Sequence, residues 1–206
     1  MNRLDRAKGR LAGILTPEER QRLALITAGT VVAAARDAGL EVWLLGPDVA
    51  ETRRIPGASR YVGESARHSG LSAQLSWAIR SLKTALILHA DLPLASGKAV
   101  DDIIAAAPHL PCAVGVESPD GGTNALLLDP PGRFPLAYGP GSFAKHRAAA
   151  ETVNVAFLRV EAPDLQLDLD TPEDIRILLA SPRGALSEAG AYLLAQGLPQ
   201  RLAELG

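Results

Sequence analysis

The 206-residue sequence has a single cysteine and lacks any run of apolar residues long enough to span a membrane. A lone Cys112 can form neither an internal disulfide nor a zinc site built from several cysteines. A secretory signal is also absent, so we expect neither a membrane segment nor export. Together these absences predict a cytoplasmic protein.

An excess of positive charge is lacking as well. The chain has 21 Lys and Arg against 23 Asp and Glu, which gives a formal net charge of −2. This balance provides no general attraction to nucleic acid or to a membrane surface, so any anion must be bound locally. The length suits one compact domain, and a content of 47% hydrophobic residues is typical of a globular protein.

Helix and strand patterns alternate along the sequence, which predicts an α/β fold. Thr16 is a predicted N-cap, followed by Pro17 and two acids, and it begins a helix that runs up to Gly39. Further helices are expected at residues 71–79, 96–107 and 185–196, and strands at 41–45, 60–62, 84–93, 112–116, 125–128, 153–160 and 165–170. We expect the last helix to pack on the outside or against a second copy of the chain, which would make a homodimer.

The acidic segment at residues 165–174 is the first candidate site. Leucines alternate with polar residues from 165 to 170, a pattern that predicts a strand with Asp168 and Asp170 on one face. Thr171 and Pro172 already begin the next helix, so capping does not require these two acids. They can bind a divalent cation at the end of the strand, or they can be solvated residues of an edge strand.

A second acid follows the longest apolar run. Residues 84–93 predict a central parallel strand that is buried on both faces and ends near Asp91. If the strands are close, Asp91 can join the acidic pair at one metal ion. The alternative is that Asp91 caps a turn with Pro93. His89 is expected to support the strand, since no partner histidine at metal-binding spacing accompanies it.

Two glycine-rich segments can each hold an anion through backbone amides. Residues 121–124 form a hairpin turn or a cradle for a carboxylate or phosphate. In the segment 138–147, Ser142 is a candidate N-cap, and Lys145 and Arg147 lie in the first helical turns, where cations oppose the helix dipole. A bound anion would explain these cations, although a solvated helix face would also accommodate them.

Two further segments have an open interpretation. The first ten residues carry Arg3, Arg6, Lys8 and Arg10 against one acid, and they form either a tail or a loop that binds phosphates. The polar loop at 63–70 precedes a helix whose free amides can hold an anion or a purine edge. The same loop can be a simple connection, with Trp77 in the core.

Six short stretches in order resemble a known enzyme family, and together they span nearly the whole chain. The stretches are residues 7–11, 70–72, 91–93, 121–126, 138–143 with His146, and 168–172. They resemble the 2-phospholactate/phosphoenolpyruvate guanylyltransferases of deazaflavin coenzyme F-420 biosynthesis, a branch of the Rossmann-like nucleotidyltransferases.

The resemblance implies a three-layer α/β nucleotidyltransferase fold with a mostly parallel central sheet at residues 1–180, followed by a helical appendage at 181–206. It also implies an enzyme that uses Mg²⁺ and transfers GMP from GTP to phosphoenolpyruvate, 2-phospho-L-lactate or a similar phosphorylated three-carbon acid, releasing pyrophosphate. Its assignments are Mg²⁺ to Asp91, Asp168 and Asp170; the acid carboxylate to Thr123 or Asn124, Gly139 and Ser142; the triphosphate to Lys8 and Arg10; and the nucleotide to Gly70, Leu71, Ser72 and Gln74.

Two departures from the family pattern keep alternatives open. Relatives usually have an apolar strand before the Lys8 loop, so the first strand is expected to be missing or truncated here, or the start to be misassigned. Ser72 stands where relatives often have asparagine. The alternatives are a molybdenum-cofactor or sugar-phosphate nucleotidyltransferase, and a non-catalytic binding protein that has lost the first strand.

Overall fold

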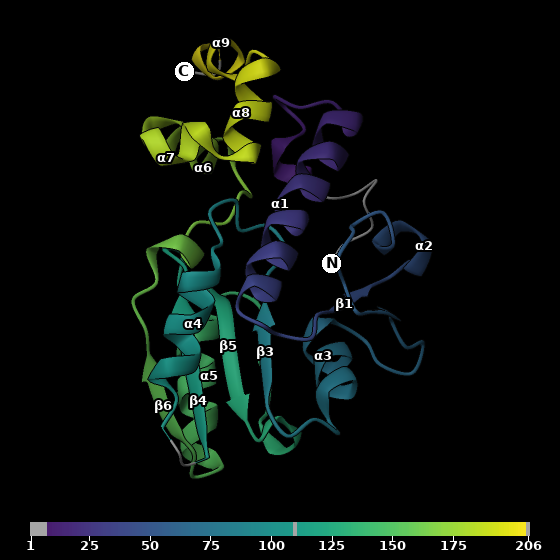
Figure 1. Ribbon diagram of the computed structural model, residues 1–206, viewed down its shortest axis with the longest axis vertical. Helices are drawn as coiled ribbons and strands as arrows, with labels where there is room; N and C mark the ends of the chain where they lie inside the picture. The colour runs from purple at the N-terminus through teal and green to yellow at the C-terminus, as the bar shows by residue number, and fades with distance from the viewer. Residues whose placement is uncertain (1–7, 109–110, 205–206) are drawn as a thin grey trace.

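A four-stranded sheet lies at the centre of the computed structural model, which describes residues 8–108 and 111–204 (Figure 1). Its strands are β3 (Ala85–Leu88), β4 (Cys112–Glu117), β5 (Thr123–Asp129) and β6 (Ala156–Arg159), in the spatial order β3-β5-β4-β6. Strands β3, β4 and β6 share one direction, and β5 runs opposite to them. The predicted mostly parallel sheet is therefore confirmed in direction, with β5 as the exception.

Helices cover both faces of this sheet, which confirms the predicted three layers. Successive strand residues point to opposite faces, so Val114 and Leu127 pack in one core and Ala113 and Leu128 in the other. The first core includes residues of α1 (Pro17–Asp37) and α4 (Gly97–Ala106), and the second includes residues of α3 (Leu71–Ile79) and α5 (Ser142–Thr152). Figure 1 shows α4 in front of the sheet and α5 behind it.

A second, smaller sheet lies beside β3. It consists of β1 (Trp43–Gly46) and β2 (Arg60–Gly63), which are parallel, together with the short helix α2 (Val49–Thr52). A cavity of about 100 Å³, lined mainly by apolar residues, separates β1 from β3 beneath α1. Within residues 8–108 and 111–204 no strand joins the two sheets. The segment expected to lack the first strand, residues 1–7, lies outside the described residues.

The predicted place of β3 was wrong in two respects. The apolar run predicts a central, parallel strand buried on both faces, but β3 lies at the edge of the four-stranded sheet and pairs antiparallel with β5. The reason is the hairpin at residues 118–122, where Gly121 has φ +81° and turns the chain back from β4. That hairpin places β5 between β3 and β4.

The helix starts predicted from the caps Thr16 and Thr171 are confirmed. Thr16 accepts a hydrogen bond from the Glu19 N–H, and the Glu19 carboxylate accepts one from the Thr16 N–H. Thr171 and Asp174 form the same reciprocal pair at the start of α6 (Pro172–Ala180). Such capping boxes satisfy backbone donors that have no partner within the helix, so these starts could be located from sequence alone.

The C-terminal region forms three short helices rather than the one predicted at 185–196. These are α7 (Pro182–Leu186), α8 (Glu188–Ala195) and α9 (Leu198–Ala203). Ser187 ends α7 and caps α8 by accepting a hydrogen bond from the Gly190 N–H, which breaks the expected helix. None of the helices in the described ranges is both long and apolar enough to cross a membrane.

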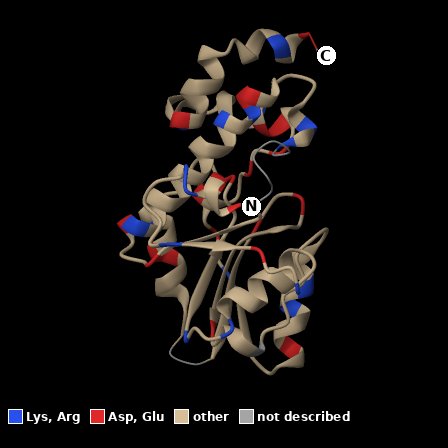
Figure 2. Cartoon of the chain, turned by 90° about the vertical axis from the view of Figure 1, so that its right-hand side faces the viewer, with Lys and Arg blue, Asp and Glu red and all other residues tan. Residues whose placement is uncertain are grey.

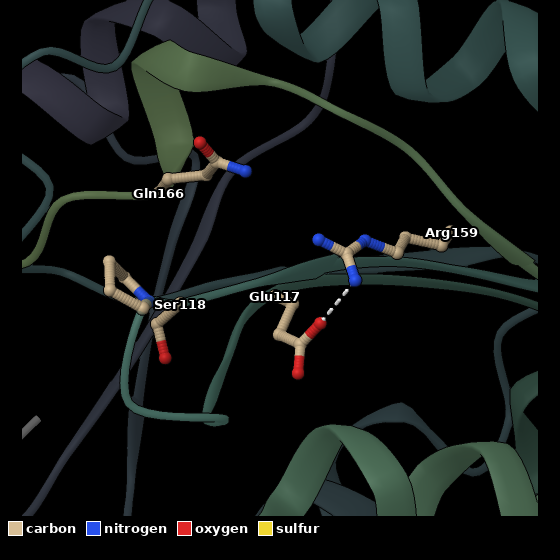
Figure 3. Close-up of a pocket in the computed structure, with 5 residues that line it drawn as sticks. Glu117, Ser118, Arg159 and Gln166 are labelled. Carbon is tan, nitrogen blue, oxygen red and sulfur yellow. Dashed lines mark ion pairs between the residues drawn. The ribbon is translucent and has the colours of Figure 1, made fainter.

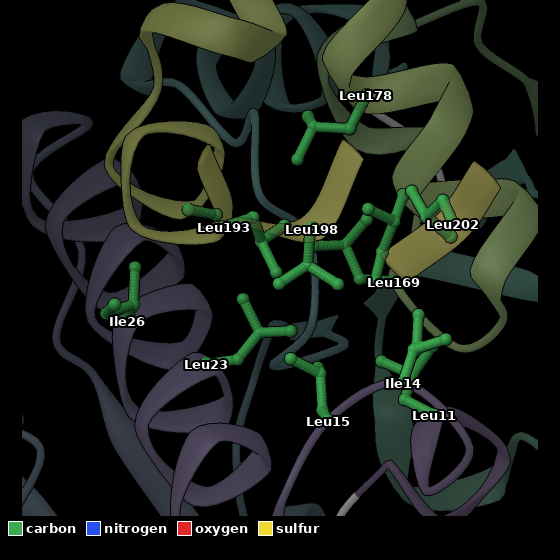
Figure 4. Close-up of a cluster of buried hydrophobic side chains, with 12 residues drawn as sticks. Leu11, Ile14, Leu15, Leu23, Ile26, Leu169, Leu178, Leu193, Leu198 and Leu202 are labelled. Atoms are coloured by element: carbon green, nitrogen blue, oxygen red, sulfur yellow. The ribbon is translucent and has the colours of Figure 1, made fainter. Parts of the chain in front are cut away.

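One apolar cluster connects these helices to the start of the described chain (Figure 4). Leu11 and Leu169 are fully buried in it, next to residues from α1, α6, α8 and α9. The short 3₁₀ helices η2 (Gly9–Leu11) and η4 (Pro163–Leu165) place Leu11 and Leu165 in the interior, while η3 (Pro131–Arg133) lies near α3. The division into residues 1–180 and 181–206 stays a prediction.

The apolar cluster that joins the C-terminal helices to Leu11 should contribute substantially to the stability of the fold. We expect Leu178→Ala, which truncates a fully buried side chain, to lower the free energy of unfolding by about 2–5 kcal/mol because it leaves a cavity. The matched control is Ile177→Ala on the same helix, where the side chain is 51% exposed and the change should stay within about 0.5 kcal/mol. Equal losses in urea denaturation would contradict this account of the core.

Candidate active site

Three aspartates from two distant segments meet at one edge of the sheet. Asp91 follows β3, and Asp168 and Asp170 lie in the segment between η4 and α6. Each of the three offers a carboxylate oxygen, and these oxygens lie within 4.8 Å of one another. The predicted convergence of Asp91 with the acidic pair is therefore present in the structure.

The acidic segment is extended but is not the strand that was predicted at 165–170. Leu165 ends a 3₁₀ helix, and the residues after it are held by separate bonds instead of a ladder. The Leu169 N–H donates to the Asp91 carbonyl at 3.2 Å, and the Asn124 side-chain amide donates to the Gln166 carbonyl at 2.8 Å. The leucine alternation instead reflects burial, since Leu165 and Leu169 are fully buried and the two aspartates are half-buried.

The environment of the aspartates opposes three negative charges. Burial, followed by the charges of Asp91 and Asp170, raises the pKa of Asp168 to about 6. Burial and the Asp91 charge also raise the pKa of Asp170, although Lys8 and Arg10 act in the other direction. Asp91 Oδ1 is buried, and no residue within 8–108 or 111–204 forms a hydrogen bond with it. A divalent cation would remove this repulsion, and carboxylate oxygens are the ligands that Mg²⁺ prefers.

Lys8 lies at the edge of this cluster, while Arg3 and Arg6 lie outside the described residues. The side chain of Lys8 is 4% exposed, and its Nζ donates to the Leu169 carbonyl at 2.7 Å and lies 3.7 Å from Asp91 Oδ2. Its backbone is left-handed, with φ +54°, at the start of η2. Arg10 is exposed. The pKa of Asp120 is lowered mainly by hydrogen bonds from Ser118 and Gly122, and the charge of Arg10 lowers it further.

A buried group on β5 and α5 forms the second part of the site. Ser142 Oγ donates to Thr123 Oγ1 at 3.0 Å, and His146 Nδ1 lies 3.0 Å from the same oxygen. Ser142 is not the predicted N-cap, because Gly141 occupies that position with φ +65° and Ser142 turns inward as the first helical residue. Gly139, with φ +125°, lies in the exposed turn before it.

The start of α3 brings the predicted nucleotide segment next to this turn. Gly70 is the N-cap with φ +81° and no side-chain cap, and Leu71 is 44% exposed. Ser72 Oγ accepts a hydrogen bond from the Tyr138 N–H at 2.9 Å. Gln74 is buried, and its amide bonds the backbone of residues 65–68, so this side chain holds the preceding loop in place.

From the sequence, His146 and Tyr138 received no individual role, and His89 received only a supporting role in the strand. His146 Nε2 accepts a hydrogen bond from the Ala137 N–H at 3.0 Å, and the Tyr138 ring lies between the rings of His89 and His146, with centroids at 5.4 and 4.8 Å. Burial lowers the pKa of His89 and raises that of Tyr138. The spacing of Ser142 and His146, one helical turn, was the available signal, because it places both on one face.

A larger cavity lies beside the aspartates but contains none of them. It has a volume of about 320 Å³ and is lined by Glu117, Ser118, Pro119, Arg159 and Gln166. Figure 3 shows the Glu117–Arg159 pair, which is joined at 2.7 Å, across from Ser118 and Gln166. Since its cation is already paired and no predicted site residue lines it, we assign no substrate to this cavity.

Charge is distributed without one dominant sign. In the view of Figure 2, basic and acidic residues are interspersed along the length of the described chain. This distribution agrees with the formal net charge of −2.

Comparisons with known proteins identify the family of this chain. The family model described as "Guanylyl transferase CofC like" matches residues 1–197. The phosphoenolpyruvate guanylyltransferase of Rubrobacter xylanophilus is 41% identical over 85% of this chain and 88% of its own length. The 2-phospho-L-lactate guanylyltransferase of Methanoregula boonei is 30% identical over 86% of this chain and 78% of its own.

A solved structure supports the fold alone. The structure of a putative nucleotide-diphospho-sugar transferase from Desulfovibrio desulfuricans G20 superposes with a TM-score of 0.80 at 12% identity. The match covers 99% of this chain and 94% of that one. It confirms the Rossmann-like α/β fold class expected from the sequence.

The buried imidazole makes the protein sensitive to acid. Burial, and then the charge of His89, lowers the pKa of His146 to about 4, below its value in an unfolded chain. As pH falls from about 6.5 to about 4, His146 becomes protonated in the unfolded state but stays neutral in the folded state. The free energy of unfolding therefore falls by up to about 3 kcal/mol. We expect His146→Asn to lose less stability over that range in urea denaturation. An unchanged pH dependence would contradict the neutral, buried imidazole.

Proposed function

This chain belongs to the guanylyl transferase CofC-like family, and from that premise we propose that it transfers GMP from GTP to phosphoenolpyruvate or 2-phospho-L-lactate and releases pyrophosphate. The family resemblance places this reaction in coenzyme F-420 biosynthesis. The cytoplasmic location, and assembly as a homodimer, are further parts of the proposal.

The observation that carries the proposal is the meeting of Asp91, Asp168 and Asp170 beside Lys8. A solvated edge strand would leave these acids apart and exposed. Instead they are half-buried, close together and mutually repelling, an arrangement that costs stability unless a ligand uses it. Transfer of a nucleotidyl group between two phosphate-bearing substrates is a reaction that needs such a site.

We propose that these three carboxylates hold Mg²⁺. The donor set fits, because it consists of oxygens only and Asp91 Oδ1 has no hydrogen-bond partner among the described residues. The bound cation supplies charge neutralisation, which lowers the repulsion between the acceptor phosphate and the α-phosphate of GTP and stabilises the leaving pyrophosphate. A phosphate oxygen of the acid is already anionic, so no general base is required from the chain.

Lys8 and Arg10 would provide the positive charge on the protein side. The Lys8 ammonium has three donors, of which one bonds the Leu169 carbonyl and another faces Asp91, so a third is left for a phosphate oxygen. Arg10 is exposed and close enough to influence Asp170 and Asp120, which suits a contact with the triphosphate. Both would stabilise the charge of the departing pyrophosphate.

The carboxylate of the acid would bind at Thr123, Gly139 and Ser142, where a hydroxyl pair lies at the start of α5. Free amides at a helix N-terminus favour an anion. Asn124 would act indirectly, because its amide holds the Gln166 carbonyl and so the segment of Asp168. Gly70, Leu71 and Ser72 would lie along the nucleotide, and Gln74 would support their loop.

The two rival functions remain open to test. A sugar-phosphate or molybdenum-cofactor nucleotidyltransferase would share the fold. The similarity to the solved structure described above supports the fold alone and does not separate these activities. A non-catalytic binding protein would keep the fold without turnover. Pyrophosphate release from GTP with each acid, with a sugar phosphate and without an acceptor separates these cases. Absence of turnover with phosphoenolpyruvate, 2-phospho-L-lactate and 3-phosphoglycerate would refute the proposal.

Asp168→Asn tests whether the acid cluster is catalytic. We expect turnover to fall by at least about 100-fold, because a metal ligand is lost, while thermal stability is kept or raised as repulsion is relieved. Asp101→Asn, at an exposed position on α4, is the control and should keep both values. If Asp168→Asn melts early and turns over normally, the residue has a structural role.

Metal binding should depend on pH near the raised pKa of Asp168. Mg²⁺ binds the folded state, so it should raise the melting temperature of the chelator-treated wild type at pH 7.5. Below pH about 6 a proton on Asp168 competes with the cation, and the shift should diminish. An equal shift at pH 5 and pH 7.5, or in Asp168→Asn, would place the cation elsewhere.

A further inference from the structure

Three buried side chains form a hydrogen-bonded group behind the turn at residues 138–141. His146 is fully buried, and Thr123 and Ser142 are 1% and 2% exposed. His146 Nδ1 and Ser142 Oγ both lie 3.0 Å from Thr123 Oγ1. Because Ser142 and His146 are one turn apart on α5, both face the same residue of β5.

The backbone determines which nitrogen of His146 carries the proton. The Ala137 N–H lies 3.0 Å from His146 Nε2, and a backbone N–H can only donate, so Nε2 must accept. Burial lowers the pKa of this imidazole to about 4, which keeps it neutral at pH 7. A neutral imidazole that accepts at Nε2 carries its proton on Nδ1, and this proton is donated to Thr123 Oγ1.

This tautomer decides whether the group has a proton to spare. With Nδ1 protonated, His146, Thr123 and Ser142 together hold three donor protons, and the two bonds among them use two. With the other tautomer, Nδ1 would accept, and the two hydroxyl protons would both be used inside the group. The observed arrangement therefore leaves one hydroxyl proton for an outside acceptor.

Among the described residues, neither hydroxyl makes a further hydrogen bond that could take this proton. The neighbouring turn leaves room for an outside acceptor. A Cβ placed on Gly139 or Gly141 would meet no atom within 4 Å, and both residues are exposed. The start of α5 has no side-chain cap, so its dipole also favours negative charge at this point.

We infer that His146 is a positioning residue, which fixes the Thr123 and Ser142 hydroxyls as a net donor toward the carboxylate of the acid acceptor. This inference rests on the function proposed above and adds to it a residue that touches neither substrate. The Ala137 N–H fixes the His146 tautomer with the proton on Nδ1, and this proton is donated to Thr123. One hydroxyl proton is then left to donate, so the group binds an anionic oxygen in preference to a hydrogen-bond donor. The rings of Tyr138 and Phe134 pack against the imidazole, with centroids 4.8 and 6.1 Å from its own.

The first test reads the tautomer directly and needs no activity. Long-range ¹H–¹⁵N spectra of the protein labelled at its four histidines separate protonated from unprotonated ring nitrogens, and His146→Asn identifies the relevant signals. We expect Nδ1 protonated and Nε2 unprotonated from pH 6 to pH 8. A protonated Nε2 overturns the inference, whether or not the wild type turns over any acid.

The second test compares two substitutions, each of which can replace only one of the two ring nitrogens: Nδ1, which donates to Thr123, or Nε2, which accepts from Ala137. The amide of His146→Asn can donate near the place of Nδ1, whereas the amide of His146→Gln reaches the place of Nε2 and leaves Thr123 without its donor. We expect His146→Gln to raise the KM for the acid by about 10- to 100-fold, and His146→Asn to recover most of that loss. The KM for GTP should stay unchanged in both.

Equal increases in the KM for the acid, or a matching increase for GTP, would show a merely structural role and overturn the inference. Melting curves of both variants confirm that each is folded at the assay temperature. The proposed function fails separately, through absence of wild-type turnover with every phosphorylated acid, and in that case the spectra still decide the tautomer.

Discussion

The main chain of Leu169 is the point on which the site depends. Its N–H bonds the Asp91 carbonyl at 3.2 Å, and its carbonyl accepts the Lys8 ammonium at 2.7 Å. Its side chain is fully buried in the cluster that includes Leu11 and residues of the C-terminal helices. One residue thus joins the end of β3, the N-terminal turn and the acidic segment. Asp168 and Asp170 face the site because the leucine between them cannot leave the core.

This anchoring explains how like charges are held together without a strand. Three carboxylates within 4.8 Å repel one another, and the pKa of Asp168 is raised by burial first and then by the charges of Asp91 and Asp170. The apolar cluster and the capping box of Thr171 and Asp174 oppose it, because Asp174 also accepts the N–H of Asp170. The C-terminal helices therefore matter for the site, even though they contribute none of its charged groups.

Local signals in the sequence were sufficient for much of the fold. Caps such as Thr16 and Thr171, and the apolar runs of β4 and β5, depend on neighbours a few residues away and could be read directly. The sheet order could not, because the hairpin at 118–122 inserts β5 between β3 and β4, a contact between distant segments. The strand predicted at 165–170 failed for a related reason: its alternation records burial of Leu165 and Leu169, and no strand in the described part of the chain pairs with this segment.

In the candidate site, too, local sequence patterns could be read directly, whereas contacts between distant segments could not. Asp91 was expected to join Asp168 and Asp170 if the strand ends were close, and the residue pattern left a turn cap and a solvated edge strand open as alternatives. The inward turn of Ser142 and its bond to Thr123 required the packing of α5 on β5, which no local pattern encodes. His146 was visible only as part of a motif, since a buried histidine reveals its tautomer through a backbone N–H that sequence cannot place.

The central claim is that burial of Leu169 builds the proposed metal site, and Mn²⁺ binding measured by electron paramagnetic resonance tests it most directly. Leu169→Ala keeps all three carboxylates, and Leu193→Ala removes an equally buried leucine of the same cluster on α8. At a temperature where both variants are folded, we expect Leu169→Ala to bind Mn²⁺ at least about ten-fold more weakly and Leu193→Ala to bind it as the wild type does. Equal affinity in all three proteins would contradict the account.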